Sequence, residues 1–307
     1  MNKCPITYEP CTEIYGSKGL KKLSPRLTTL VDLPFTAAEQ RQEAATRAGK
    51  MSVQGVQAKL SAKLNIPAQG FDIVDQFGTF IIKPQSDVYL QLPENEALTM
   101  KMAQLFKIDV PISGLIYAKD KSFSYFVKRF DRLPKGEKQA LEDFAQLTGN
   151  TRDTKYNFSM EKLLQVLDDF CTFPQLEKRK LFRRTLFCFI TGNEDMHLKN
   201  FSLIRQNNKI ELSPAYDYLN TTISMRNARE EIALPLAGKK NKLTKEHFFD
   251  YYAKERMQLS PKVISYEYSH LHTKIEVLLE LINKSFLNEK LKSNYSRLLN
   301  ERYQRLM

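Results

Sequence analysis

A stretch of ten residues, GNEDMHLKNF (192–201), concentrates side chains that can bind a metal, contact phosphate or move a proton. Asp195 and Asn200 are separated by four residues, and His197 and Lys199 lie between them. A long apolar run, RRTLFCFIT, precedes this stretch, and a second run, FSLI, follows its asparagine. A polar loop flanked by two buried segments is either a plain connection or the part of the chain that these segments hold in place.

The Asp195–Asn200 spacing is that of a protein kinase catalytic loop, in which the aspartate accepts the proton of the attacking hydroxyl and the asparagine holds magnesium on the phosphates. Magnesium prefers oxygen ligands and takes few carboxylates from a protein, so one further carboxylate is expected nearby. A hairpin, FSLIR–QNNK–IELSP, precedes Asp217 and should return it beside Asn200. The spacing therefore predicts Asp195 as the base, with Asn200 and Asp217 as metal ligands. His197 is either a loop imidazole bonded to backbone or a phosphate contact.

Phosphoryl transfer also needs positive charge on the nucleotide phosphates. The strand TFIIKP places Lys83 where kinases place such a lysine, although a solvated lysine at a strand end is the competing interpretation. Glu94 and Glu96 are candidate partners, and only one of them can face inward because they are two residues apart. Upstream, MSVQGVQAKL is not a Walker loop, but Gly55 permits a close approach to phosphates and Lys59 adds charge.

Strand patterns dominate residues 51–131, interrupted by one helix, PENEALTMKMAQLFKI. Helix patterns follow from about residue 140: SMEKLLQVLDDF, the stretch 174–193, and nearly everything after Thr244. Residues 1–50 are poorly periodic and end in a short helix. The pattern predicts an α+β protein whose two parts meet near residues 131–140.

The bulk properties indicate a folded protein that has either an acidic partner or simply a basic surface. The chain has 307 residues and a formal net charge of +12, which favours nucleic acid, a nucleotide or an acidic protein without choosing among them. No signal peptide or apolar run long enough for a membrane span is found, so a cytoplasmic location with reduced thiols is expected. The cysteines have no metal-site spacing; they are Cys4, Cys11, Cys171 and Cys188.

The ordered set SxxGVQxK, IIKP, ENE, VKRFDR, GNxDxHxKNFS and PAYD resembles the HipA kinases of bacterial toxin–antitoxin systems, from about Ser52 through Asp217. The short form, HipT, is the most similar, because only 51 residues precede Ser52. The resemblance implies a bilobal, protein-kinase-like α+β fold with a small N-lobe and a larger helical C-lobe. The implied parts are a partner-contact extension over 1–50, the N-lobe with its phosphate loop over 51–135, and the C-lobe over 136–307.

The resemblance also assigns roles to single residues. Asp195 matches the catalytic base, and Asn200 and Asp217 match the magnesium ligands. Ser52 matches a serine that family members autophosphorylate, which ejects the phosphate loop and silences the enzyme. The residues implied to bind ATP are Ser52, Val53, Gln54, Gly55, Val56, Gln57, Lys59, Lys83, Glu96, Lys128, Phe130, His197, Lys199 and Asn200.

Among these, Glu96 matches the partner of the phosphate-binding lysine, and the backbone of Phe130 matches the hinge that meets adenine. Two positions depart from the family pattern. Lys128 stands where most members have an acid, and Gln54 stands where related short forms can carry a second serine.

As a whole, the resemblance implies a serine/threonine-protein kinase toxin that uses ATP and Mg²⁺ and inhibits translation by phosphorylating a protein, typically an aminoacyl-tRNA synthetase. Implied partners are a HipS-like small protein and a HipB-like antitoxin, with DNA contacted only through the antitoxin and no membrane. Two other functions remain open: a kinase of small molecules or lipids, and a catalytically silent component of a repressor–DNA complex.

Overall fold

The computed structural model describes residues 2–47, 57–133, 137–225 and 230–307. These residues form two compact units, each described by itself. The first unit contains Met1–Leu98, Pro111–Glu137 and Lys284–Leu287, and the second contains Thr99–Val110, Lys138–Asn283 and Asn288–Met307. Within the described ranges, no helix combines the length and the apolar character that crossing a membrane requires.

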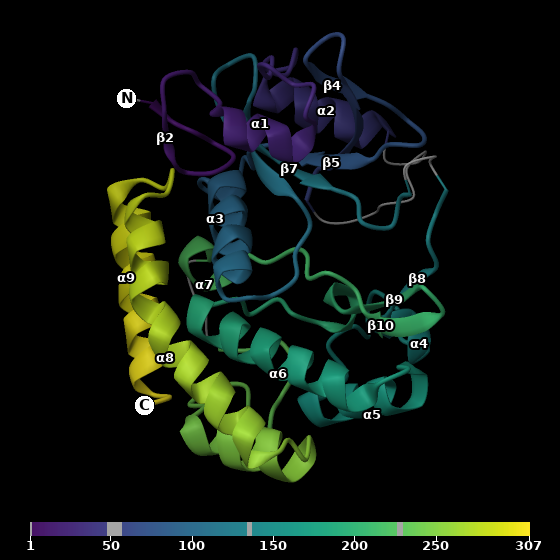
Figure 1. Ribbon diagram of the computed structural model, residues 1–307, viewed down its shortest axis with the longest axis vertical. Helices are drawn as coiled ribbons and strands as arrows, with labels where there is room; N and C mark the ends of the chain where they lie inside the picture. Colours follow the sequence, from purple (N-terminus) through teal and green to yellow (C-terminus); the bar gives the residue numbers. More distant parts are fainter. Residues whose placement is uncertain (1, 48–56, 134–136, 226–229) are drawn as a thin grey trace. The chain divides into compact units, whose positions relative to one another are not determined.

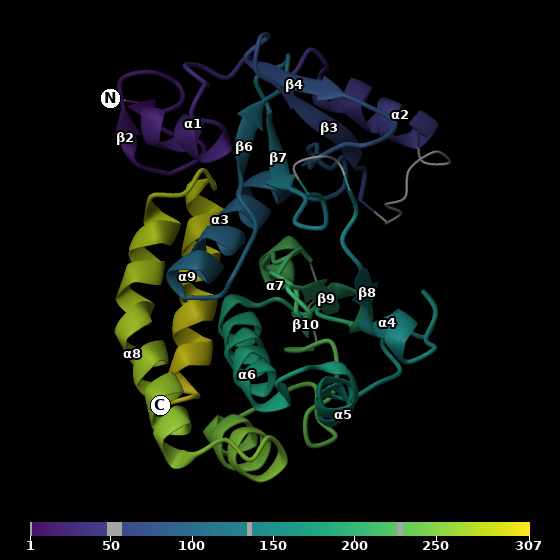
Figure 2. The same ribbon diagram turned by 45° about the vertical axis from the view of Figure 1, so that its right-hand side comes forward.

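An antiparallel sheet of five strands is the centre of the first unit (Figures 1 and 2). In spatial order the strands are β4 (Gly70–Ile73), β3 (Leu60–Asn65), β5 (Phe80–Lys83), β7 (Phe123–Lys128) and β6 (Ser113–Tyr117). β6 and β7 pair directly, as expected for two runs joined by a short turn, whereas β4 and β5 both pair with β3. This antiparallel sheet, interrupted in the chain by one helix between β5 and β6, and the mainly helical second unit confirm the α+β class.

The N-terminal segment packs into the core of this unit. Its elements are β1 (Asn2–Lys3), β2 (Pro10–Cys11), α1 (Ser17–Leu23) and α2 (Ala37–Arg47). Cys4, Ile6 and Leu20 are buried in one cluster with Phe80 and Phe126 of the sheet. Residues 2–47 thus cover an apolar face that a lone sheet would leave in water. That residues 1–50 form a partner-contact extension, as the resemblance implied, stays a prediction.

Helix α3 (Leu92–Leu105) begins in the first unit and ends in the second. Pro93 stands in the first turn, where its missing N–H is not needed, and Glu94 lies at the positive end of the helix dipole. Gln91 before it has a left-handed backbone (φ 51°), and its Nε2 donates to Glu94 Oε1 at 3.2 Å. These features fix the start of the helix and thereby the position of Glu96.

The second unit is mainly helical and holds a small sheet with strand order β10–β9–β8 (Figures 1 and 2). The strands are β8 (Leu141–Asp143), β9 (Ser202–Gln206) and β10 (Lys209–Leu212). The helices are α4 (Phe144–Leu147), α5 (Met160–Phe170), α6 (Pro174–Thr191), the 3₁₀ turn η2 (Leu198–Asn200), α7 (Thr221–Ser224), η3 (Glu246–Arg256), α8 (Pro261–Asn283) and α9 (Glu289–Gln304). α8 and α9 run side by side in both views.

A local sequence signal explains where α5 begins and which of its residues are buried. α5 begins after Ser159, whose hydroxyl accepts from the amide of Lys162 at 3.4 Å, and it buries Leu163, Val166 and Leu167 at helical spacing. Phe248, Phe249 and Tyr252 of η3 are buried in the core, and the hydrogen bonds of this helix follow the rare π pattern rather than the α pattern.

Candidate active site

Helix α6 leads directly into the polar loop, and its last six residues are all buried. Gly192 ends the helix with a left-handed backbone (φ 71°), and its carbonyl accepts from the amides of Thr221 at 2.9 Å and Thr222 at 3.2 Å. The amide of Asn193 donates to Cys188 O at 2.9 Å. The start of the loop is therefore attached both to α6 and to the chain that follows the hairpin.

The hairpin predicted after the loop is present as β9 and β10. Leu203 lies opposite Leu212, and the turn residues Asn207 and Asn208 have φ values of 48° and 61°. Two consecutive positive φ values are typical of a type I′ turn, which asparagine tolerates and which matches the twist of the strands. The hairpin therefore returns the chain to the end of the polar loop.

Asp217 follows this return and lies beside the loop. The Tyr216 hydroxyl donates to the carbonyl of Lys199 at 3.0 Å and lies 2.6 Å from Ser202 Oγ. The negative charge of Asp217 acts on both Tyr216 and His197. Asp217 itself has a left-handed backbone (φ 57°), an uncommon conformation for a residue with a side chain and one that clusters at functional sites.

Asn200 is oriented by the backbone of Asp195. Its Nδ2 donates to Asp195 O at 2.7 Å, which leaves Oδ1 as the atom able to bind a cation. An amide oxygen from Asn200 and a carboxylate from Asp217 are the hard ligands that Mg²⁺ takes in small numbers beside phosphate and water. Over the part of the chain that is described, no group of three or more His, Cys, Asp or Glu side chains is placed to hold a metal. The donor set fits a magnesium ion shared with a phosphate, rather than a cage made only of protein.

Asp195 is held by a residue outside the loop. Its Oδ1 accepts a hydrogen bond from the Tyr156 hydroxyl at 2.5 Å, and its own amide donates to Asn193 Oδ1 at 3.2 Å. The Asp195 side chain is 45% exposed, so it can be reached from solvent. Nothing in the local sequence marked Tyr156, which lies 39 residues upstream.

His197 is a buried imidazole facing two donors. Lys155 Nζ lies 2.8 Å from Nε2, and the amide of Lys199 donates to Nδ1 at 3.3 Å. A neutral imidazole has one acceptor nitrogen, so these donors compete, and the shorter contact favours Nε2 as the acceptor. Burial lowers the pKa of His197 below its usual range, against the opposing charges of Asp195 and Asp217, so the ring is neutral at pH 7. Its contact with a nucleotide stays a prediction.

Glu194, beside the expected base, anchors the loop to the C-terminal helix. Arg302 of α9 places Nη2 3.1 Å from Glu194 Oε1 in a buried ion pair, and Thr222 donates to the same oxygen. The amide of Glu194 donates to Thr221 Oγ1 at 2.7 Å. Burial raises the pKa of Glu194, while the hydrogen bond from Thr222 and the charge of Arg302 oppose this rise. No local pattern in the sequence marks Arg302, which lies 108 residues from Glu194.

In the first unit, the structure chooses between the two candidate partners of Lys83. Lys83 Nζ lies 2.6 Å from Glu96 Oε1, and the side chains are 4% and 1% exposed. Glu94 instead accepts from Gln85 Nε2 at 2.6 Å. Lys83 is therefore not a solvated lysine at a strand end, and Glu96 is its inward-facing partner as the resemblance implied.

The remaining predicted ATP contacts are placed unevenly. Residues 52–56 of the expected phosphate loop, with Ser52, lie outside the described residues. Gln57 and Lys59 are half-buried and lie just before β3. Lys128 is exposed at the end of β7, and Phe130, two residues later, is half-buried. Lys199 pairs with Asp143 at 2.7 Å in the second unit.

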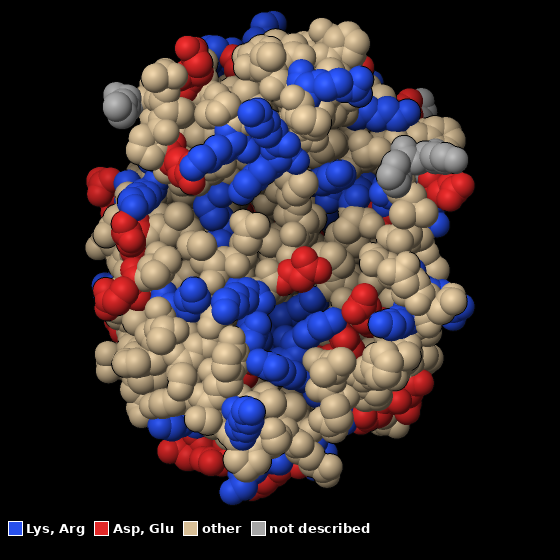
Figure 3. All heavy atoms as spheres, in the orientation of Figure 1, with Lys and Arg blue, Asp and Glu red and all other residues tan. Residues whose placement is uncertain are grey.

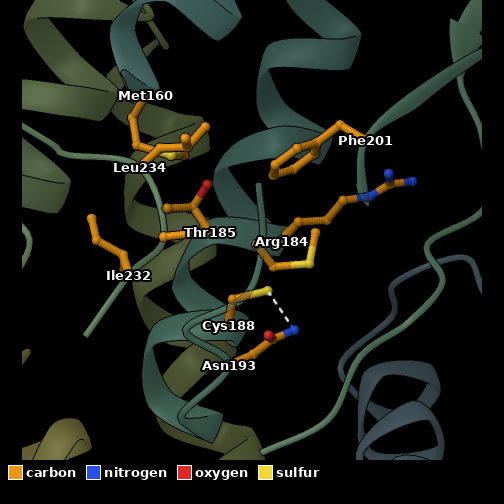
Figure 4. Close-up of a pocket in the computed structure, with 10 residues that line it drawn as sticks. Met160, Arg184, Thr185, Cys188, Asn193, Phe201, Ile232 and Leu234 are labelled. Atoms are coloured by element: carbon orange, nitrogen blue, oxygen red, sulfur yellow. Dashed lines mark hydrogen bonds between the residues drawn. The ribbon is translucent and has the colours of Figure 1, made fainter. Parts of the chain in front are cut away.

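A small cavity lies beside the loop, but its lining does not suit a nucleotide. Arg184, Thr185 and Cys188 of α6 and Ile232 and Leu234 of a later segment surround it (Figure 4). Its exposed lining is almost entirely apolar, whereas a phosphate site needs cations and N–H groups.

Comparison with known proteins assigns the family. The chain matches the HipA-like C-terminal domain over residues 51–279. It is 31% identical over 241 residues to a Haemophilus influenzae protein named "Putative kinase", covering 72% of this chain and 69% of that protein. It is 28% identical over 191 residues to the "Serine/threonine-protein kinase toxin HipA" of Shewanella oneidensis, covering 56% of this chain and 43% of that protein. The chain therefore belongs to the HipA-like family, whose members include kinases.

The fold is shared with two solved proteins. One is the HipA of a Shewanella oneidensis structure with HipB and operator DNA, with a TM-score of 0.70 at 20% identity over 91% of this chain and 72% of that one. The other is the Helicobacter pylori proinflammatory kinase CtkA, with a TM-score of 0.53 at 15% identity over 74% of this chain and 86% of that one. At these identities the likeness concerns the fold alone.

Proposed function

We propose that this protein is a serine/threonine-protein kinase toxin that phosphorylates a protein hydroxyl at the expense of magnesium-ATP. The observation that carries the proposal is the loop of the second unit, where Asp195, an oriented Asn200 and Asp217 are assembled by a hairpin return. Family membership supports it, since named relatives are kinases and one is a serine/threonine kinase toxin.

Each residue has a chemical role in this proposal. Asp195 takes the proton of the acceptor hydroxyl, and Asn200 Oδ1 and Asp217 hold the magnesium ion. Lys83, kept in place by Glu96, contributes positive charge to the phosphates. Magnesium-ATP, when bound, supplies the phosphoryl group and shields its negative charge.

The substitutions Asp195→Asn and Asp217→Asn test these roles. Each keeps the size of the side chain and removes its charge, so transfer of radiolabel from ATP to protein should fall about 10²- to 10⁴-fold for the base. Asp250→Asn, at an exposed aspartate of η3, is the matched control and should keep full activity. Phosphorylation at the wild-type level in either site variant would show that the roles are wrongly assigned.

The competing function, a kinase of small molecules or lipids, is separated by the fate of the label. Protein phosphorylation requires the label to enter a protein band, whereas label in metabolite or lipid fractions of a cell extract would support the other function. A catalytically silent protein would label neither fraction and would bind ATP equally with and without magnesium.

We further propose that the toxin acts with an antitoxin and regulates itself. The solved HipA of similar fold was crystallised with HipB and operator DNA, which supports a HipB-like partner here, with a HipS-like protein as a second one. An aminoacyl-tRNA synthetase is the proposed target, and Ser52 the proposed site of autophosphorylation. Co-purification of the neighbouring gene products and intact-mass analysis of wild type against Ser52→Ala are the direct measurements.

A further inference from the structure

The segment just before α5 is bonded to the catalytic loop at three points. The Tyr156 hydroxyl donates to Asp195 Oδ1 at 2.5 Å. The carbonyl oxygen of Lys155 accepts a hydrogen bond from the amide of Leu198 at 3.2 Å. The side-chain Nζ of Lys155 lies 2.8 Å from His197 Nε2. A backbone bond and two side-chain bonds to one short loop define the position of this segment better than a single contact could.

The ring of Tyr156 also contacts the loop. It packs edge-on against His197, with centroids 5.1 Å apart and planes at 86°, and Lys155 Nζ lies 5.0 Å from its centre. Burial and the neighbouring Asp195 raise the pKa of Tyr156, so the phenol stays protonated and acts as a donor. Even so, the residue is 39% exposed, so one side of it faces solvent.

The two oxygens of Asp195 therefore differ. Oδ1 is occupied by the Tyr156 hydroxyl, whereas Oδ2 accepts no hydrogen bond from any residue in the described part of the chain. The side chain is 45% exposed, so Oδ2 can meet a group arriving from solvent. A carboxylate with one oxygen fixed and one oxygen available has a defined direction in which it can accept a proton.

We propose that Tyr156 is a positioning residue for phosphoryl transfer: its phenol holds Oδ1 of Asp195, so that Oδ2 is the oxygen that meets the acceptor hydroxyl. This inference rests on the proposed kinase function and names a residue to which neither the family match nor the named relatives assign a role. Tyr156 does not contact the reacting atoms in this scheme and acts only through Asp195.

The test is Tyr156→Phe, which removes the hydroxyl and keeps the ring against His197. Loss of a hydrogen bond to a charged group predicts a fall in kcat of about ten- to a hundredfold. KM for ATP and KM for the protein acceptor should stay within about twofold, because the substitution removes no group that binds either of them. Tyr89→Phe, at a tyrosine of the first unit that is 41% exposed, is the matched control and should match wild type.

Two outcomes overturn the proposal. An unchanged kcat means that Asp195 needs no support from Tyr156. A raised kcat means that Tyr156 instead blocks the base and must leave before the acceptor binds. A loss of activity in Asp195→Asn with wild-type kinetics in Tyr156→Phe would sink this inference and leave the kinase function standing.

A second measurement does not depend on activity. In a crystal structure of Tyr156→Phe, the Asp195 carboxylate should leave its present rotamer or become disordered, while the backbone of the loop stays in place. An Asp195 side chain that keeps its rotamer without the phenol would contradict the positioning role, even if the purified protein phosphorylated nothing.

Discussion

At the scale of single residues, the Lys83–Glu96 pair is a buried ion pair of the first unit. The two charges lie 2.6 Å apart and almost out of water, with the ring of Tyr125 centred 5.6 Å from the ammonium. A buried ion pair adds little net stability, because desolvation offsets its attraction, but breaking it leaves a charge stranded. The pair is therefore better explained by holding a lysine charged and oriented than by stabilising the fold.

A double-mutant cycle tests this interpretation. Glu96→Gln and Lys83→Met should each lower the free energy of unfolding by about 3–5 kcal/mol, because each removes one member of a buried ion pair whose atoms lie 2.6 Å apart. The double substitution should cost clearly less than the sum of the two single ones. Chemical denaturation measures all three, and additive effects would mean that the residues do not depend on each other.

The Lys83–Glu96 double-mutant cycle also separates the effect of this pair on folding stability from its effect on kinase activity. The double variant keeps the fold but has lost the cation expected at the phosphates, so ATP-dependent phosphorylation should disappear while the protein stays folded. Activity close to wild type in a folded double variant would remove Lys83 from the list of phosphate contacts.

At the scale of elements, the junction of α6 with the polar loop 192–201 depends on one glycine, Gly192. A Cβ on Gly192 would lie 2.5 Å from Leu298 Cδ2 of α9, 2.7 Å from Asn220 Oδ1 and 2.9 Å from Thr222 Oγ1. These are closer than real Cβ contacts, and a φ of 71° is itself unfavourable for any side chain. The close approach allows α7 and α9 to hold the loop.

Gly192→Ala should therefore lower the free energy of unfolding by about 2–4 kcal/mol, from backbone strain and crowding together. Gly149→Ala is the matched control, because Gly149 has a φ of 68° and nothing within 4 Å of its Cβ site. It should show only the backbone term of about 1–2 kcal/mol. Equal losses in the two variants, measured by thermal or urea unfolding, would show that the junction is not crowded.

The C-terminal helix also contributes to the loop through Arg302. Its guanidinium donates to Phe189 O at 2.8 Å as well as pairing with Glu194, so it bonds both the end of α6 and the residue next to the expected base. A helix about a hundred residues downstream thus belongs to the machinery that positions the site.

At the scale of the whole molecule, the net charge affects which partners the protein attracts, and ligand binding affects its stability. The net charge of +12 is visible as groups of Lys and Arg on the face shown in Figure 3. Such a surplus attracts acidic partners and weakens as salt is added. It is consistent with an antitoxin–DNA complex or a tRNA-associated target and selects neither.

Magnesium-ATP should stabilise the whole protein if the donor set of Asn200 and Asp217 holds the ion. A ligand that binds only the folded state at a hundred times its Kd adds about 2.7 kcal/mol, so the melting temperature should rise with ATP and magnesium together. Chelation of magnesium should remove most of the rise, and Asp217→Asn should do the same without a chelator. A rise of the same size in EDTA would refute the magnesium site.

Many of the elements and turns of this protein could be predicted from its sequence, because the signals that specify them are local. The strand and helix periods, the Asn207–Asn208 turn, the Ser159 cap and the glycine that ends α6 each lie within a few residues of the structure they specify. The hairpin then made the approach of Asp217 to the loop predictable, since paired strands fix where the chain returns.

The sequence by itself determined the α+β class, the family, and the Asp195–Asn200 loop with the hairpin that follows it. Only the tertiary structure showed that the Lys83–Glu96 pair is buried, that residues 2–47 complete a core, and that Tyr156 and Arg302 hold the loop. The physical reason is that periodicity and turn chemistry act between near neighbours. Contacts across 39 or 108 residues are set by packing and by the need of buried polar groups for partners, which no short pattern records.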